Sequence, residues 1–159
     1  MINKLNFQIS YKDSTWDKTT TRHIILKIMI DNIEYSSWGY SFTSLFDSIS
    51  KDGEYYIFTC SCGTPGCAGI FNGVIVIHEE NHIIWKVPDP ISIDTDDENY
   101  NEDDEVKYKT YTFDKNQYAG SIISAIAKIK EYIRTCPHPR IQMGDGFDGD
   151  VSYILKLKT

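Results

Sequence analysis

The segment that most constrains the fold is a single stretch with the repeat of an amphipathic helix. Four isoleucines recur along it at helical spacing: Ile122, Ile126, Ile129 and Ile133. Asp114 and Gln117 form a capping-box pattern at its start, and Cys136-Pro137-His138-Pro139 stops it. Residues at this spacing lie along one face of a helix. The sequence therefore predicts one long helix that buries an isoleucine stripe.

Most of the remaining chain alternates between apolar and polar residues, which is typical of half-buried strands. We expect a short helix at 42–50, closed by Gly53, and loops at 13–22 and 144–150. Strands are expected at 5–11, 24–30, 33–35, 55–59, 74–78, 83–87, 106–113 and 151–157. One dominant helix among short strands and hairpins favours an α+β fold. We expect one domain over 1–159, with a mainly antiparallel sheet on which the long and the short helix pack.

Three of the four cysteines lie in one glycine-rich turn, Cys60-Ser61-Cys62-Gly63-Thr64-Pro65-Gly66-Cys67-Ala68-Gly69. This spacing lets a tight turn direct three thiols to one point. Zinc bound by thiolates is tetrahedral, so a fourth ligand is needed. Cys136, just past the long helix, is the first candidate, and His138 is the second.

Zinc is therefore a candidate cofactor, held by Cys60, Cys62 and Cys67 with Cys136 or His138. Disulfide frameworks spread their cysteines to join distant segments, so we expect no disulfide here. Two other interpretations stay open. The cysteines can pack as small apolar side chains without metal, or one of them can act as a redox or catalytic thiol.

The cysteine turn has the spacing of the post-SET zinc knuckle of histone methyltransferases, although nothing else in the chain resembles their catalytic domain. More of the chain is similar to a family of small uncharacterised bacterial proteins with a CxCGxxGCxG turn. That similarity includes the run from Phe58 to Trp85, the segment Tyr111-Thr112-Phe113-Asp114, and Tyr118. It implies a shared fold and no established activity.

The acidity of the chain is concentrated in one segment, 94–105, which contains no lysine or arginine. Its eight acidic residues are Asp94, Asp96, Asp97, Glu98, Glu102, Asp103, Asp104 and Glu105. Removing these eight from the 23 acidic residues leaves 15 against 16 basic residues. We expect this segment to be a mobile insertion, because it offers little apolar surface to bury.

The charge pattern and the absence of long apolar runs limit which ligands and locations we expect for the protein. Nucleic acid is not expected as a ligand, since its recognition requires a basic face. No apolar run is long enough for a membrane span, and Met1 to Asn6 lacks the pattern of a secretory signal. A cytoplasmic location is therefore expected.

Two classes of function follow. The first is a non-catalytic protein-binding module, such as a bacterial immunity protein that neutralises a basic toxin domain through its acidic surface. The second is a zinc- or thiol-dependent protein that uses the turn from Cys60 to Cys67 for structural zinc, redox sensing or catalysis.

Overall fold

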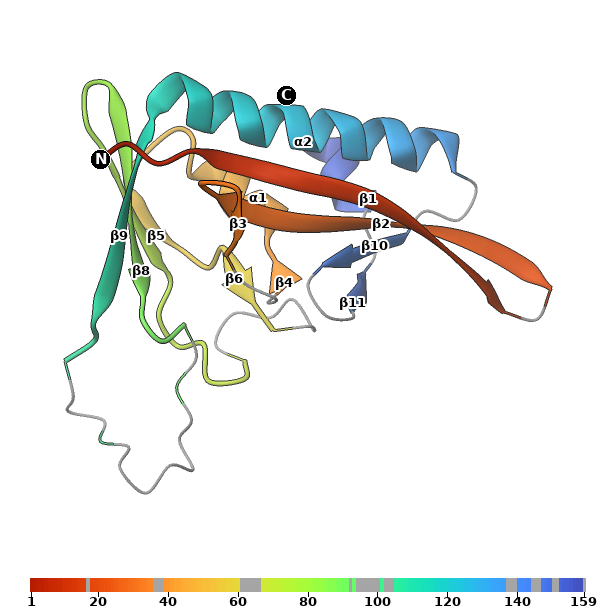
Figure 1. The fold of residues 1–159 in the computed structure, drawn as a ribbon, viewed down its shortest axis with the longest axis horizontal. Coiled ribbons are helices and arrows are strands. Elements are labelled where there is room, and N and C mark those ends of the chain that lie inside the picture. Colours follow the sequence, from red (N-terminus) through yellow and green to blue (C-terminus); the bar gives the residue numbers. More distant parts are fainter. Residues whose placement is uncertain are drawn as a thin grey trace.

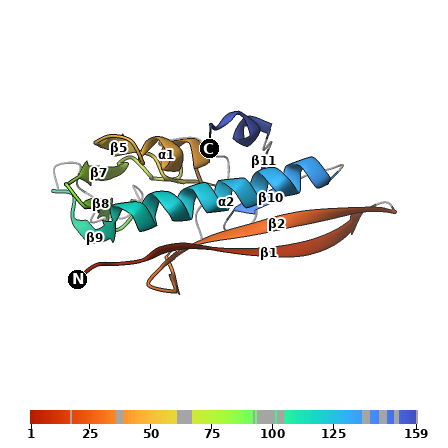
Figure 2. The ribbon, with the colours of Figure 1, turned by 90° about the horizontal axis from the view of Figure 1, so that it is seen from above.

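Mainly antiparallel strands, one long helix and two short helical segments form the described part of this protein, as a computed structural model shows (Figure 1). The structure describes residues 1–16, 18–35, 39–60, 67–91, 93, 101, 105–136, 140–143, 147–149 and 152–158. The helix α2 (Lys115–Thr135) extends along the molecule, with the hairpin of β1 and β2 on one side and the short helix α1 (Phe42–Asp47) on the other (Figure 2). The predicted α+β class is confirmed.

The first sheet is built on a long hairpin. β1 (Leu5–Trp16) pairs antiparallel with β2 (Thr19–Ile30) along its whole length. The other edge of β2 pairs with β3 (Ile33–Glu34) and, in parallel, with β10 (Arg140–Met143), which pairs with β11 (Phe147–Gly149). Asp31 and Asn32 form the turn from β2 to β3, with positive φ at both residues. The loop expected at 13–22 is wrong, because both strands continue through most of it.

The second sheet has the antiparallel order β5-β7-β8-β9. Its strands are β5 (Gly53–Tyr55), β7 (Val74–His78), β8 (His82–Pro88) and β9 (Tyr108–Asp114). The predicted hairpin of β7 and β8 is confirmed. The strand expected at 55–59 is divided, because β6 (Phe58–Thr59) leaves this sheet and pairs with β4 (Gly39–Tyr40). The short helix ends before Gly53, which belongs to β5.

The start of α2 matches the sequence pattern only in part. Asp114 is the N-cap, and its carboxylate accepts a hydrogen bond from the backbone N–H of Gln117 at 2.9 Å. The reciprocal half of a capping box is not formed, because the Gln117 side chain bonds the backbone of Leu5 instead. Three residues of the isoleucine stripe are buried, and Ile133 is partly buried against the core.

The chain ends in a 3₁₀ helix, η1 (Ser152–Lys156), where a strand is expected from the alternation at 151–157. Ile154 of η1 is fully buried, and the Lys130 ammonium of α2 donates a hydrogen bond to the carbonyl of Leu157. Contact with the helix therefore decides the conformation of this short apolar segment. β11 lies within the loop expected at 144–150, and β10 forms in a stretch for which the sequence predicts no element.

An aromatic cluster fills the space between α2 and the second sheet. Trp85 is fully buried and makes edge contacts with Phe58, Phe113 and Tyr118, at ring-centroid distances of 6.4, 5.2 and 5.7 Å. Such tilted contacts stabilise aromatic pairs beyond the area that they bury. This cluster fixes α2 against β8 and β9.

Candidate functional site

The cysteine turn follows β6, which brings Cys60 to the end of a buried strand. Cys60 is only 6% exposed and is disulfide-bonded. The expectation of a chain without disulfides is therefore wrong at this residue. Cys67 and Cys136 are free thiols and half-buried, so neither of them is the partner of Cys60.

The remaining parts of the predicted zinc site are not placed together by the described chain. Cys62 and His138 lie outside the described residues. Within the described ranges, no three His, Cys, Asp or Glu side chains group in a way that could hold a metal ion. Cys136 is the C-cap of α2, and that end of the helix lies apart from β6 in Figure 1. Zinc binding therefore stays a prediction.

The acidic segment leaves the second sheet between β8 and β9. Asp89 and Lys107 close its base, since the Asp89 N–H donates to the Lys107 carbonyl at 2.9 Å. Of its eight acidic residues only Glu105 is described, and it is exposed. The other seven lie outside the described residues: Asp94, Asp96, Asp97, Glu98, Glu102, Asp103 and Asp104. The mobility expected of this segment therefore stays a prediction.

A second contact joins Ile93, just before the acidic segment, to Gly69, the last residue of the cysteine turn. The Ile93 N–H donates to the Gly69 carbonyl at 2.8 Å. Gly69 has a φ of +73°, and a Cβ at this position would collide with the Ile93 carbonyl. Only glycine combines this backbone conformation with so close an approach. Ile93, which comes just before the acidic segment, and Gly69 are therefore held next to each other.

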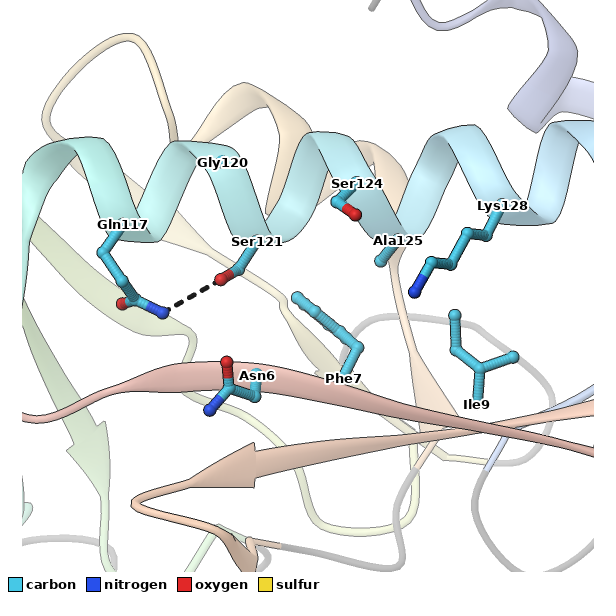
Figure 3. A pocket seen from close by; sticks show the side chains of 9 residues that line it. All are labelled: Asn6, Phe7, Ile9, Gln117, Gly120, Ser121, Ser124, Ala125 and Lys128. Atoms are coloured by element: carbon cyan, nitrogen blue, oxygen red, sulfur yellow. Dashed lines mark hydrogen bonds between the residues drawn. The ribbon is translucent and has the colours of Figure 1, made fainter.

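A groove of about 400 Å³ lies between β1 and α2 (Figure 3). Its lining comes from two segments that are far apart in the sequence: Asn6, Phe7, Ile9, Gln117, Gly120, Ser121, Ser124, Ala125 and Lys128. Figure 3 shows Phe7 and Ile9 directed toward the helix, with Gln117 and Ser121 directed toward the strand. The sequence does not reveal this groove, because no motif links the two segments.

Gln117 closes one end of the groove with three hydrogen bonds. Its side-chain oxygen accepts from the Leu5 N–H at 3.2 Å, and its nitrogen donates to the Leu5 carbonyl and to the Ser121 hydroxyl at 2.5 and 2.9 Å. Leu5 lies on β1, whose outer edge pairs with no other strand among the described residues. The Gln117 amide therefore occupies the place that a peptide group of another strand would take.

A chain of buried hydrogen bonds crosses the core behind this groove. The Trp85 N–H donates to the Tyr118 hydroxyl at 2.9 Å, and the Tyr118 and Ser48 hydroxyls are 2.6 Å apart. Ser48 donates its own proton to the Leu45 carbonyl, so Tyr118 must donate to Ser48. Burial raises the pKa of Tyr118 above its ordinary value, although its bonds to Ser48 and Trp85 favour the anion. The neutral phenol is therefore a structural link between α2, β8 and α1.

Comparison of the chain with protein-family models, with curated proteins and with solved structures gives no match in any of the three. The similarity to bacterial proteins with a CxCGxxGCxG turn therefore stays a prediction. In the part of the chain that is described, no helix has both the length and the apolar character needed to cross a membrane. The cytoplasmic location also stays a prediction.

Proposed function

We propose that this chain is a non-catalytic protein-binding module, of the kind represented by bacterial immunity proteins, which docks a basic partner through the acidic segment 94–105. The observation that carries the proposal is the concentration of eight carboxylates in a segment without any lysine or arginine. Clustered charge of one sign steers an oppositely charged partner and raises its association rate by about 10- to 1,000-fold.

The backbone contacts at both ends of the segment support this role. Asp89 bonds Lys107 at the base, and Ile93 bonds Gly69 before the first acidic residue. Both contacts fix the origin of the segment on the second sheet and its neighbouring loop. Fixed flanking residues limit how far the segment can move from the sheet, which favours a directed encounter with a basic surface.

The experiment begins with affinity capture of the partner from the source organism, followed by purification of the partner. Association rates are then measured by stopped-flow fluorescence at increasing salt for the wild-type chain and for a variant with all eight acidic residues changed to their amides. The wild-type rate should fall steeply with salt, because screening shortens the range of the attraction to about 8 Å at physiological ionic strength. The variant should associate slowly at every salt concentration.

A matched control removes charge elsewhere in the molecule. Glu79 and Glu80 are exposed in the turn between β7 and β8, and E79Q/E80Q should leave the association rate unchanged within about twofold. A basic partner that binds the amide variant as fast as wild type would contradict the proposal. So would equal losses for the amide variant and the control.

The second candidate is a thiol- or zinc-dependent protein, and the disulfide at Cys60 favours its thiol chemistry over zinc binding. In the oxidised form Cys60 has no thiolate to offer, so zinc can bind at the turn only after reduction. Reduced protein, dialysed against zinc and analysed for metal, should then hold about one zinc ion per chain, and C67S should lose it. Equal zinc content in the oxidised, reduced and C67S proteins would exclude this candidate.

A further inference from the structure

We propose that the groove between β1 and α2 binds an extended acidic peptide, which adds to the outer edge of β1 as another strand. This site is distinct from the acidic segment and does not depend on the function proposed above. Three observations carry it: the hydrogen-bonding direction of the β1 edge, the amide of Gln117 already bound there, and a lysine over the groove that has no partner among the described residues.

The first observation is that alternate residues of β1 present their backbone groups to the groove. In an antiparallel pair, every second residue exchanges both hydrogen bonds with its partner, and the residues between them point both groups to the other edge. The backbone N–H and C=O of Leu5 point to the outer edge, since both bond the Gln117 side chain. The register with β2 is continuous from Leu5 to Trp16. Phe7 and Ile9 therefore also direct their N–H and C=O groups outward, and both line the groove.

The second observation identifies the chemistry that this edge binds. The primary amide of Gln117 accepts from the Leu5 N–H and donates to the Leu5 carbonyl, which are the two bonds that a neighbouring strand would make. The edge thus already holds one amide group at its first outward residue. The next two outward residues, Phe7 and Ile9, offer the same pair of groups, and no side chain of a described residue bonds them in this way. An extended peptide satisfies both of them, and strand addition of this type is a common mode of peptide recognition.

The third observation is a positive charge at one end of the groove. Lys128 lies over the Ile9 end of the groove in Figure 3. It makes no hydrogen bond or ion pair with any described residue. The remaining lining has no charged side chain, and Ser121 and Ser124 add hydroxyls on the same wall. An acidic side chain on the peptide is therefore the matching partner for this end.

The helix leaves room for such a segment. Gly120 faces the groove, and a Cβ built there would meet no atom within 4 Å. A volume of about 400 Å³ lies within the range of about 300–1,000 Å³ that is typical of ligand sites. A short peptide backbone can therefore enter between the small side chains of α2 and the edge of β1.

The test uses one probe peptide, acetyl-Asp-Val-Thr-Val-Asp-amide, and its counterpart with Asn in place of both Asp residues. An acidic residue at each end makes the probe independent of strand direction, and valine and threonine favour the extended conformation. Binding at millimolar peptide is followed by NMR with backbone amide exchange. The amides of Phe7 and Ile9 should exchange more slowly with peptide. The Gln8 amide, which bonds β2, should not change.

Two variants on α2 separate the groove from the rest of the helix. G120F fills the groove and should abolish binding, whereas A127F places the same ring at an exposed position of α2 that does not line the groove. K128Q should lower the affinity for the acidic peptide by about twofold to fivefold, as expected for an exposed ion pair. Its affinity for the Asn peptide should equal that of the wild-type chain. The eight-amide variant of segment 94–105 should bind the probe normally, which keeps this result separate from the proposed function.

Three outcomes would overturn the inference. The first is no slowing of exchange at Phe7 and Ile9 with either peptide. The second is equal loss of binding in G120F and A127F. The third is a dimer in sedimentation that G120F dissociates, because the edge would then belong to a second copy of the chain.

Discussion

Removal of a single oxygen atom from the core should measurably destabilise the protein. The change is Y118F, which deletes the hydroxyl between Trp85 and Ser48. Trp85 is fully buried, so its N–H would lose its acceptor without gaining water. An unsatisfied buried donor costs about 1–3 kcal/mol. Ser48 loses only the bond that it accepts from Tyr118 and keeps the bond that it donates to Leu45, so it contributes less to the loss of stability.

We therefore expect Y118F to lower the free energy of unfolding by about 2 kcal/mol. For a chain of 159 residues this corresponds to a fall in Tm of about 4–8 °C. The measurement is urea denaturation followed by tryptophan fluorescence, with the m value compared between variants. Y108F is the matched control, because Tyr108 is 38% exposed, and it should change the free energy by less than about 0.5 kcal/mol.

A double-mutant cycle with S48A tests whether the hydroxyls act as one chain. S48A alone removes the acceptor of Tyr118 and the donor to Leu45. In the Y118F background the first of these losses no longer exists, so S48A should cost less there than in wild type. A free energy of unfolding for Y118F within about 0.5 kcal/mol of wild type, or full additivity of the two changes, would refute this role of the hydroxyls.

Other predictions follow from pKa values, backbone contacts and cysteines. Burial raises the pKa of Tyr118 above 10.0, so the unfolded chain loses this proton first, and stability should fall as pH rises above about 10; Y118F should make that slope shallower in alkaline urea titrations. G69A should collide with the Ile93 carbonyl and lower Tm, whereas G120A, whose Cβ would meet no atom within 4 Å, should not. In denaturant without reductant, mass spectrometry should find Cys67 alkylated and Cys60 not; alkylation of both would contradict the disulfide.

The strongest periodic signals of the sequence predicted the structure well. The helix that Asp114 caps and the hairpin of β7 and β8 form as predicted, because in each the apolar residues recur on one face that the core buries. The extension of β1 and β2 through 13–22 was missed, because Lys12, Asp13 and Thr15 are exposed and carry no alternation. Their strand conformation comes from backbone pairing with β2 rather than from a buried face.

Features that depend on distant residues could not be read from the sequence. Gln117 fits a capping box locally, yet its amide bonds Leu5, which is 112 residues away. The apolar residues of 151–157 suggest a strand, but contact with α2 selects a 3₁₀ helix. The groove has the same origin, since it exists only where β1 and α2 meet.

The bond between Gln117 and the edge of β1 also sets an order of events during synthesis. The ribosome produces the hairpin of β1 and β2 early, whereas Gln117, which bonds the backbone of Leu5 at the edge of β1, is translated 112 residues after Leu5. Through that interval the nascent hairpin carries an open strand edge, which is a template for pairing with other chains. Slow translation of the middle of the chain should therefore increase aggregation, and a chaperone that holds extended strands should decrease it.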